Sequence, residues 1–99
     1  MRKYRTFKKD LNEKLKDPKF RRGFYQELHG LKIGYQIAQL RKQLGWTQQE
    51  LARRIGTSQG AVTRLESGRY ASYSLKTLEK IALATGAELD LRLRLPKAA

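Results

Sequence analysis

The side chains best suited to chemistry in this sequence are hydrogen-bonding groups, and they gather between residues 46 and 70. Glutamine amides, hydroxyls and arginine guanidinium groups recur there at helical spacing. The single histidine, His29, has no cysteine to activate, and beside Gly30 it is expected to be exposed or to cap a helix. No paired carboxylates, metal-ligand cluster or phosphate-binding glycine loop occurs. The sequence therefore predicts a binding protein and not an enzyme, with no metal and no cofactor.

The balance of charge predicts the kind of partner. The 99 residues include 22 Lys or Arg against 9 Asp or Glu, a formal net charge of +13. This length suits one small domain with a short appendage. A polyanion such as nucleic acid would balance the excess charge, and an incidentally basic domain is the alternative. The sequence has no apolar run that could span a bilayer and no signal peptide, so a cytoplasmic protein is expected, associated with the nucleoid when bound to DNA.

Two short amphipathic helices are predicted on either side of Gly56. Thr47 and Glu50 have the spacing of a capping box, in which each side chain bonds the other residue's amide at the start of the first helix. Thr57 or Ser58 begins the second helix, and Gly68 ends it. The expected inward positions are Leu51, Ala52 and Ile55 in the first helix and Ala61, Val62 and Leu65 in the second.

The turn between these helices predicts a helix-turn-helix unit. Gly56 can adopt the positive φ that the turn requires, and Ala52 is small enough for a close helix crossing. The second helix would be anchored from beneath, and its N-terminal residues could meet base edges in a DNA major groove. Its outer side carries Ser58, Gln59, Gly60, Thr63 and Arg64.

Flanking helices complete a predicted domain over residues 33–86. The first begins at Ile33 and ends at Gly45, while Gly30 and Gly34 are expected to break or weaken the helix around them. The last is capped by Ser74 and stops at Gly86. Its expected inward residues are Leu75, Leu78, Ile81 and Ala82.

Residues 1–32 form a predicted helical extension in two parts. Asp17 can cap the second helix with Pro18 at its first position. Two apolar stripes either pack on the rest of the domain or dock on a partner protein. With 11 basic and 4 acidic residues, the extension carries a net charge of +7, so it could instead lie along DNA. The two stripes are Phe7, Leu11 and Leu15, and Phe20, Phe24 and Leu28.

Residues 87–99 change to a period of two. Leucines alternate there with charged residues, which predicts a half-buried β-strand. The chain offers no second strand to pair with it, so two copies pairing across a two-fold axis are expected to form a dimerisation ribbon. A frayed tail is the alternative. The leucines are Leu89, Leu91, Leu93 and Leu95.

The segment TQQELARRIGTSQGAVTRLESGR, with the helices around it, resembles the Xre/Cro/lambda-repressor-like family of regulators. The resemblance implies that Gln48 contacts a phosphate, that Gln59 bonds an adenine edge and that Arg64 contacts a base such as guanine or the DNA backbone. Gly60 departs from the phage repressors, which often have a second glutamine there. The DNA-binding residues implied are Thr47, Gln48, Ser58, Gln59, Gly60, Thr63, Arg64, Arg69 and Tyr70.

The wider arrangement resembles HigA-type antitoxins of toxin–antitoxin systems. That resemblance implies a homodimer on a palindromic operator that represses its own operon, and a RelE/HigB-like ribonuclease toxin as a second partner. A stand-alone Xre-family repressor is the alternative, and a DNA-packing protein with little sequence preference fits poorly with an ordered recognition helix. The expected fold is mainly α, a lambda-repressor-like bundle with an N-terminal helical extension and a C-terminal dimerisation strand.

Overall fold

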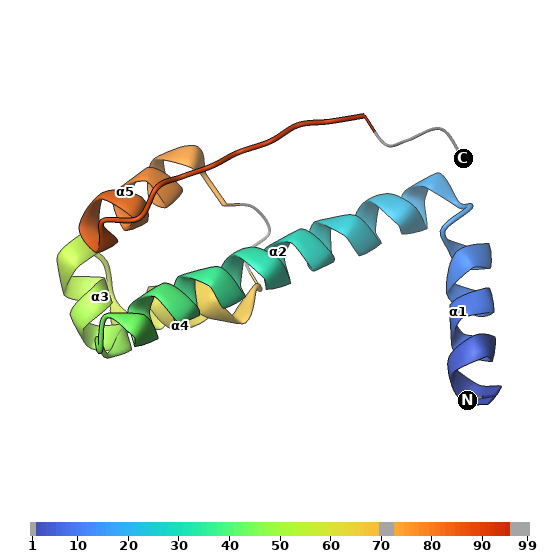
Figure 1. The fold of residues 1–99 in the computed structure, drawn as a ribbon, viewed down its shortest axis with the longest axis horizontal. Helices are drawn as coiled ribbons and strands as arrows, with labels where there is room; N and C mark the ends of the chain where they lie inside the picture. The colour runs from blue at the N-terminus through green and yellow to red at the C-terminus, as the bar shows by residue number, and fades with distance from the viewer. Residues whose placement is uncertain (1, 70–72, 96–99) are drawn as a thin grey trace.

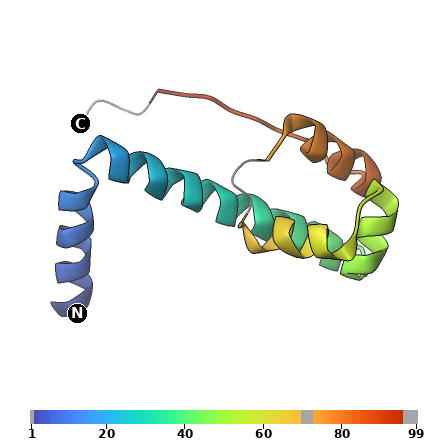
Figure 2. The same ribbon diagram turned by 180° about the vertical axis from the view of Figure 1, so that it is seen from behind.

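Five α-helices make up the regular structure of the described part of the chain. The computed structural model describes residues 2–69 and 73–95. Within these residues the long helix α2 extends from a bundle formed with α3, α4 and α5 at one end to α1 at the other, and the chain finishes in an extended tail (Figures 1 and 2). No helix in the described ranges is long and apolar enough to cross a membrane. The helices are α1 (Arg2–Lys14), α2 (Pro18–Gln43), α3 (Gln48–Ile55), α4 (Gln59–Ser67) and α5 (Leu75–Thr85).

Side-chain caps begin four of the helices where the sequence predicts them. The side chain of Asp17 accepts from the amide of Lys19 at 3.0 Å, with Pro18 at the first helical position. A cap of this kind satisfies an amide that has no carbonyl partner within the helix. The other three caps, at the start of α3, α4 and α5, are Thr47, Ser58 and Ser74.

Helix α2 is not broken at either of its central glycines. It continues from Pro18 to Gln43, so the expected boundary between residues 32 and 33 falls inside a helix. The glycines instead allow α2 to cross α4 closely. A Cβ atom built on Gly34 would lie 2.6 Å from the carbonyl oxygen of Glu66, and one on Gly30 would lie 2.8 Å from that of Gly68. Any side chain at these positions would therefore push the two helices apart.

A small core fills the bundle formed by α2 to α5. Leu51 and Val62 are completely buried at its centre, and Trp46 and Tyr73 pack against its edge. The helix pairs with extensive contacts all lie among α2, α3, α4 and α5, and α1 is in none of them. Leu75 was expected to face inward, but it is exposed beside its cap, Ser74. The buried core residues are Ile37, Leu51, Ala52, Val62, Leu65 and Ile81.

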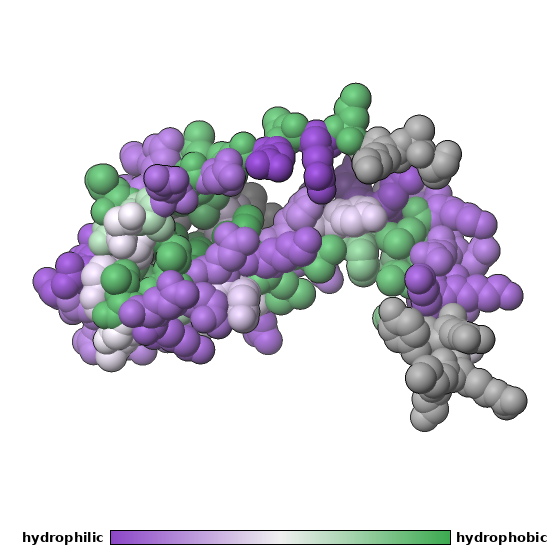
Figure 3. All heavy atoms as spheres, in the orientation of Figure 1, coloured by the Kyte–Doolittle hydropathy of each residue, from purple (hydrophilic) through white to green (hydrophobic). Residues whose placement is uncertain are grey.

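The prediction of a C-terminal dimerisation strand is not supported by the described residues of the tail. Residues 87–95 have no strand structure, and the remainder of the expected segment lies outside the described residues. A strand is held by a ladder of hydrogen bonds to a neighbouring strand, and nothing in the described parts of this chain supplies one. The tail starts over a groove between α2 and α5, whereas Leu93 and Leu95 are almost fully exposed. Figure 3 shows hydrophobic side chains along this outer part of the tail.

Candidate nucleic-acid interface

Helices α3 and α4 form the predicted helix-turn-helix. Gly56 ends α3 with φ 74° and ψ 41°, the left-handed conformation that glycine adopts without steric cost. Ser58 then caps α4 by accepting from the amide of Ala61 at 3.1 Å. The inner side of α4 is anchored by Val62 and Leu65 in the core. Its outer side is exposed, and it carries Ser58, Gln59, Gly60, Thr63 and Arg64.

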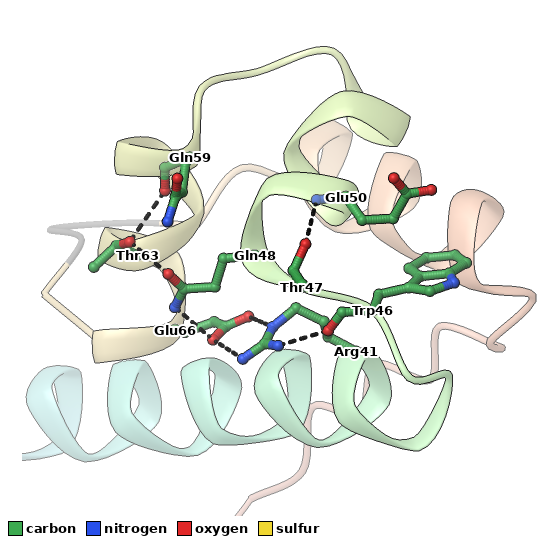
Figure 4. A network of polar contacts seen from close by, with 8 residues as sticks. All are labelled: Arg41, Trp46, Thr47, Gln48, Glu50, Gln59, Thr63 and Glu66. Atoms are coloured by element: carbon green, nitrogen blue, oxygen red, sulfur yellow. Dashed lines mark hydrogen bonds and ion pairs between the residues drawn. The ribbon is translucent and has the colours of Figure 1, made fainter.

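An ion pair between α2 and α4 fixes the recognition helix against the long helix. Arg41 donates to the two carboxylate oxygens of Glu66, from Nε at 2.6 Å and from Nη2 at 3.0 Å (Figure 4). The side chains are only 12% and 8% exposed, respectively. Arg41 also donates from Nη1 to the carbonyl oxygen of Trp46 at 2.7 Å, so the same guanidinium holds the chain that leads into α3. This fork-shaped contact orients three elements at once.

Hydrogen bonds of Gln48 extend the network from this ion pair to α3 and to the outer side of α4. The Gln48 Nε2 group donates to Glu66 Oε1 at 3.1 Å, and the Gln48 Oε1 atom accepts from the Thr63 hydroxyl at 2.9 Å. Because an ionised carboxylate can only accept, the amide nitrogen of Gln48 must be the end that faces Glu66. The side chain of Gln48 is therefore held in one orientation at the first position of α3.

The charge state of Glu66 follows from this network. Burial alone would raise the pKa of Glu66, but hydrogen bonds from Arg41 and Gln48 and the charge of Arg41 outweigh burial and lower the pKa below its ordinary value. The hydrogen bond to Glu66 raises the pKa of Arg41 in turn. Both groups are therefore charged at neutral pH. The carboxylate of Glu66 thus reaches across from α4 to Arg41 on α2.

A second charged cluster lies on the other side of α3. Glu50 accepts from Arg53 at 2.6 Å and from Arg54 at 2.9 Å, which lowers the pKa of Glu50. Arg54 lies 4.2 Å from the centre of the Trp46 ring. Figure 4 shows Trp46 and Glu50 turned away from Gln59. These arginines thus have partners on the side away from the recognition helix, and Trp46 packs at the edge of the core.

The capping box at α3 is formed only in part. The Thr47 hydroxyl accepts from the amide of Glu50 at 3.0 Å, as predicted. The return contact from Glu50 to the amide of Thr47 is replaced by the ion pairs of Glu50 with Arg53 and Arg54. Two guanidinium groups compete for the carboxylate, and both attract it more strongly than a neutral amide does.

The structure brings three of the predicted DNA-binding residues together across α3 and α4, namely Gln48, Gln59 and Thr63. The Thr63 hydroxyl links them, because it lies 2.9 Å from Gln48 Oε1 and 3.1 Å from the carbonyl oxygen of Gln59. Arg64 is exposed on α4, and Arg69 is exposed just beyond the end of that helix. Tyr70 lies outside the described residues. His29 is exposed within α2, with its ring 6.3 Å from that of Tyr25.

The predicted partner-docking stripes lie on α1 and the first half of α2. Phe7 is 65% exposed, and Phe20 is exposed with its ring 6.3 Å from that of Phe24. The stripe on α1 is not packed on the bundle core, contrary to one of the two alternatives that the sequence left open. The other stripe residues, Leu11, Leu15, Phe24 and Leu28, are half-buried.

Sequence reasoning missed Arg41, the residue that connects α2 to Glu66 of α4 and to the chain before α3. Its signal was present, because Arg41 lies one helical turn after the core residue Ile37 and so falls on the inward stripe. Glu66 lies one turn after the core residue Val62 in the same way. Two opposite charges on two inward stripes predict an ion pair between the helices, since a buried charge requires a partner.

The fold and this exposed recognition helix define a class of protein, the helix-turn-helix DNA-binding regulators. The sequence pattern of the helix-turn-helix family matches residues 37–91, and the chain belongs to that family. An uncharacterized HTH-type transcriptional regulator of Methanothermobacter thermautotrophicus (strain Delta H) is 48% identical over 52 residues, which cover 52% of this chain and 74% of the relative. No solved structure matches the chain.

Proposed function

We propose that this protein is a sequence-specific transcriptional regulator that binds a palindromic operator as a homodimer. The observation that carries the proposal is the exposed outer side of α4, held rigidly by the core and by the Arg41–Glu66 ion pair. A helix presented in this way fits the major groove, where base edges differ in their hydrogen-bonding pattern. The net charge of +13 supplies attraction to phosphates, and binding should weaken steeply as salt rises.

The outer residues of this site divide into two roles. Gln59 at the start of α4 is suited to bond the N6 and N7 edge of adenine, and Arg64, five residues later, is suited to guanine. Gln48 is suited to contact a phosphate, because it lies at the start of α3 and its side-chain amide is held in place by Glu66. Two copies related by a two-fold axis would place their recognition helices about 34 Å apart, one turn of DNA. The exposed tail leucines offer apolar surface to the second copy.

A second activity is proposed for α1 and the first half of α2, the neutralisation of a RelE/HigB-like ribonuclease toxin. The support is the exposed aromatic surface around Phe7 and Phe20, which the bundle core does not use. Apolar burial would have to carry this contact, because the extension is basic and such toxins are commonly basic too. A stand-alone repressor fits the fold equally well, with the extension lying along DNA.

Co-expression with the product of the small reading frame adjoining its gene tests both activities. The variant Phe7→Ser/Phe20→Ser is expected to lose at least tenfold in co-purified partner, because two exposed apolar side chains leave the contact. Its binding to the DNA upstream of its own gene should be unchanged. The matched control is Lys8→Ser/Lys19→Ser, which alters neighbouring exposed positions on the same helices and should keep the partner.

Three outcomes separate the alternatives. Retention of the partner by the phenylalanine variant would contradict the assigned docking surface. A wild-type protein that binds its upstream DNA but captures no partner is a stand-alone repressor. If the wild-type protein binds that DNA no better than unrelated DNA, the regulator proposal itself is wrong.

A further inference from the structure

The Thr63 side chain has a hydroxyl, which hydrogen-bonds within the protein, and a methyl group, which does not. Its hydroxyl lies 2.9 Å from Gln48 Oε1 and 3.1 Å from the carbonyl oxygen of Gln59. A hydroxyl has a single proton to donate, and both neighbours are acceptors, so the proton is held within the protein. Figure 4 shows the hydroxyl of Thr63 turned toward Gln48 and the methyl group on the opposite side.

The network behind Gln48 keeps the Thr63 side chain in this orientation. If Thr63 rotated to offer its hydroxyl to DNA, Gln48 Oε1 would lose its donor. Gln48 cannot compensate by turning over, because its amide nitrogen faces the carboxylate of Glu66, which is fixed in turn by Arg41. The largely buried Arg41–Glu66 ion pair thus favours the orientation in which the Thr63 hydroxyl faces Gln48 and the methyl group is left for contact with a ligand.

The position of Thr63 on α4 places this methyl group beside the expected base contact. Thr63 follows Gln59 by four residues, so the two side chains are neighbours on one face of the helix. Both residues are exposed on the outer side of α4. The only methyl group that unmodified bases present in the major groove is the 5-methyl group of thymine.

We infer that the methyl group of Thr63 reads the 5-methyl group of a thymine next to the base contacted by Gln59. The inference rests on the proposed operator binding and extends it to a specificity-determining residue. A threonine on a recognition helix can either hydrogen-bond a base or phosphate through its hydroxyl or contact a thymine through its methyl group. Here the single hydroxyl proton is held by Gln48 and the carbonyl oxygen of Gln59, so the hydroxyl does not donate to a base, and the methyl group is left for apolar contact.

Uracil substitution tests this inference, because uracil is thymine without the methyl group. The probe is the duplex that the full-length protein selects from a random-sequence pool, with each thymine replaced by uracil in turn. The wild-type protein should lose about fourfold in affinity at one thymine of each half-site, the effect of removing one methyl group from an apolar contact. Thr63→Ser keeps the hydroxyl and lacks the methyl group, so it should bind thymine and uracil equally there.

Two further variants separate the methyl group from the hydroxyl. Thr63→Val keeps a methyl group and lacks the hydroxyl, so it should retain the preference for thymine even if its overall affinity falls with the loss of the contact to Gln48. Thr57→Ser, which removes a methyl group from the exposed turn before α4, should leave the preference unchanged. If Thr63→Ser prefers thymine as strongly as the wild type at every position, the inference is wrong. If the wild-type protein selects no duplex, the proposed function is wrong.

Discussion

Replacing Arg41 with Met is expected to lower the free energy of unfolding by about 3–5 kcal/mol, as for other broken buried ion pairs. The substitution preserves most of the side-chain volume but leaves the carboxylate of Glu66, whose side chain is 8% exposed, without its main partner. It also removes the donor to the carbonyl oxygen of Trp46. Urea-induced unfolding followed by the fluorescence of Trp46 would measure the loss.

Two controls identify the ion pair as the cause. Arg53→Met removes a guanidinium from a pair in which Arg53 is 70% exposed, and it should cost less than about 1 kcal/mol. Adding Glu66→Met to Arg41→Met removes the unpaired charge and should restore most of the stability, because two matched apolar side chains can replace a buried pair. If the double variant is no more stable than Arg41→Met, the ion pair is not what the single substitution breaks.

Acidification should weaken the wild-type protein through the same pair. The pKa of Glu66 lies below 4.5 in the folded chain and returns toward 4.5 on unfolding, so the folded state favours the ionised form. This stability is fully present above pH 4.5 and is lost as the pH falls through the lower folded-state pKa. In Arg41→Met the remaining effect of burial raises the pKa of Glu66, and the loss of stability in acid should become smaller. An equal acid dependence in both proteins would contradict this account.

Replacing Gly34 with Ala is expected to destabilise the fold by about 1–3 kcal/mol, the usual cost of forcing atoms into a packed interior. The new Cβ would lie 2.6 Å from the carbonyl oxygen of Glu66 and 2.8 Å from that of Leu65. Both atoms belong to the backbone of α4, so relief requires the two helices to separate. Separation would also lengthen the Arg41–Glu66 contact. Thermal unfolding of the purified variant would measure the effect.

Gly23 offers a matched control in the same helix. A Cβ atom built on Gly23 meets nothing within 4 Å, so Gly23→Ala should gain up to about 1 kcal/mol from the higher helix propensity of alanine. The same substitution is thus expected to have opposite signs at two positions of α2. If Gly34→Ala also stabilises the protein, the close crossing of α2 and α4 is wrong.

The parts of the fold that local chemistry decides could be predicted from the sequence. The hydroxyls of Ser58 and Ser74 accept hydrogen bonds from backbone amides at the start of their helices. Gly56 ends α3 because the turn needs a positive φ. The inward stripe of α4 follows from helical periodicity, and Val62 and Leu65 are buried as expected.

The parts that depend on tertiary structure could not be predicted in the same way. In the sequence, Gly30 and Gly34 are typical of helix breaks. Only the structure shows that the backbone at Glu66 and Gly68 packs against them. The Arg41–Glu66 pair joins residues 25 positions apart, and only the packing of α2 on α4 brings them together. The alternation of the tail leucines predicts a strand, but residues 2–69 and 73–95 provide no second strand with which it could form a hydrogen-bond ladder.

The candidate site shows the same division. Periodicity alone places Gln59, Thr63 and Arg64 on the exposed side of α4. It does not show that the Thr63 hydroxyl is used by Gln48, which changes the chemistry that Thr63 can offer a base. The positions of the residues were therefore predictable, whereas the groups that they present depend on a network across three helices.

The central claim, that α4 reads base edges through Gln59, is tested most directly by the base preference of Gln59→Ala. Affinities would be measured for the selected operator and for duplexes with every single base-pair change. We expect Gln59→Ala to lose about 1–3 kcal/mol of discrimination at one position of each half-site and to keep it elsewhere. Gln49→Ala, at an exposed glutamine of α3, should keep the wild-type preference. An unchanged preference in Gln59→Ala would contradict base readout by this residue.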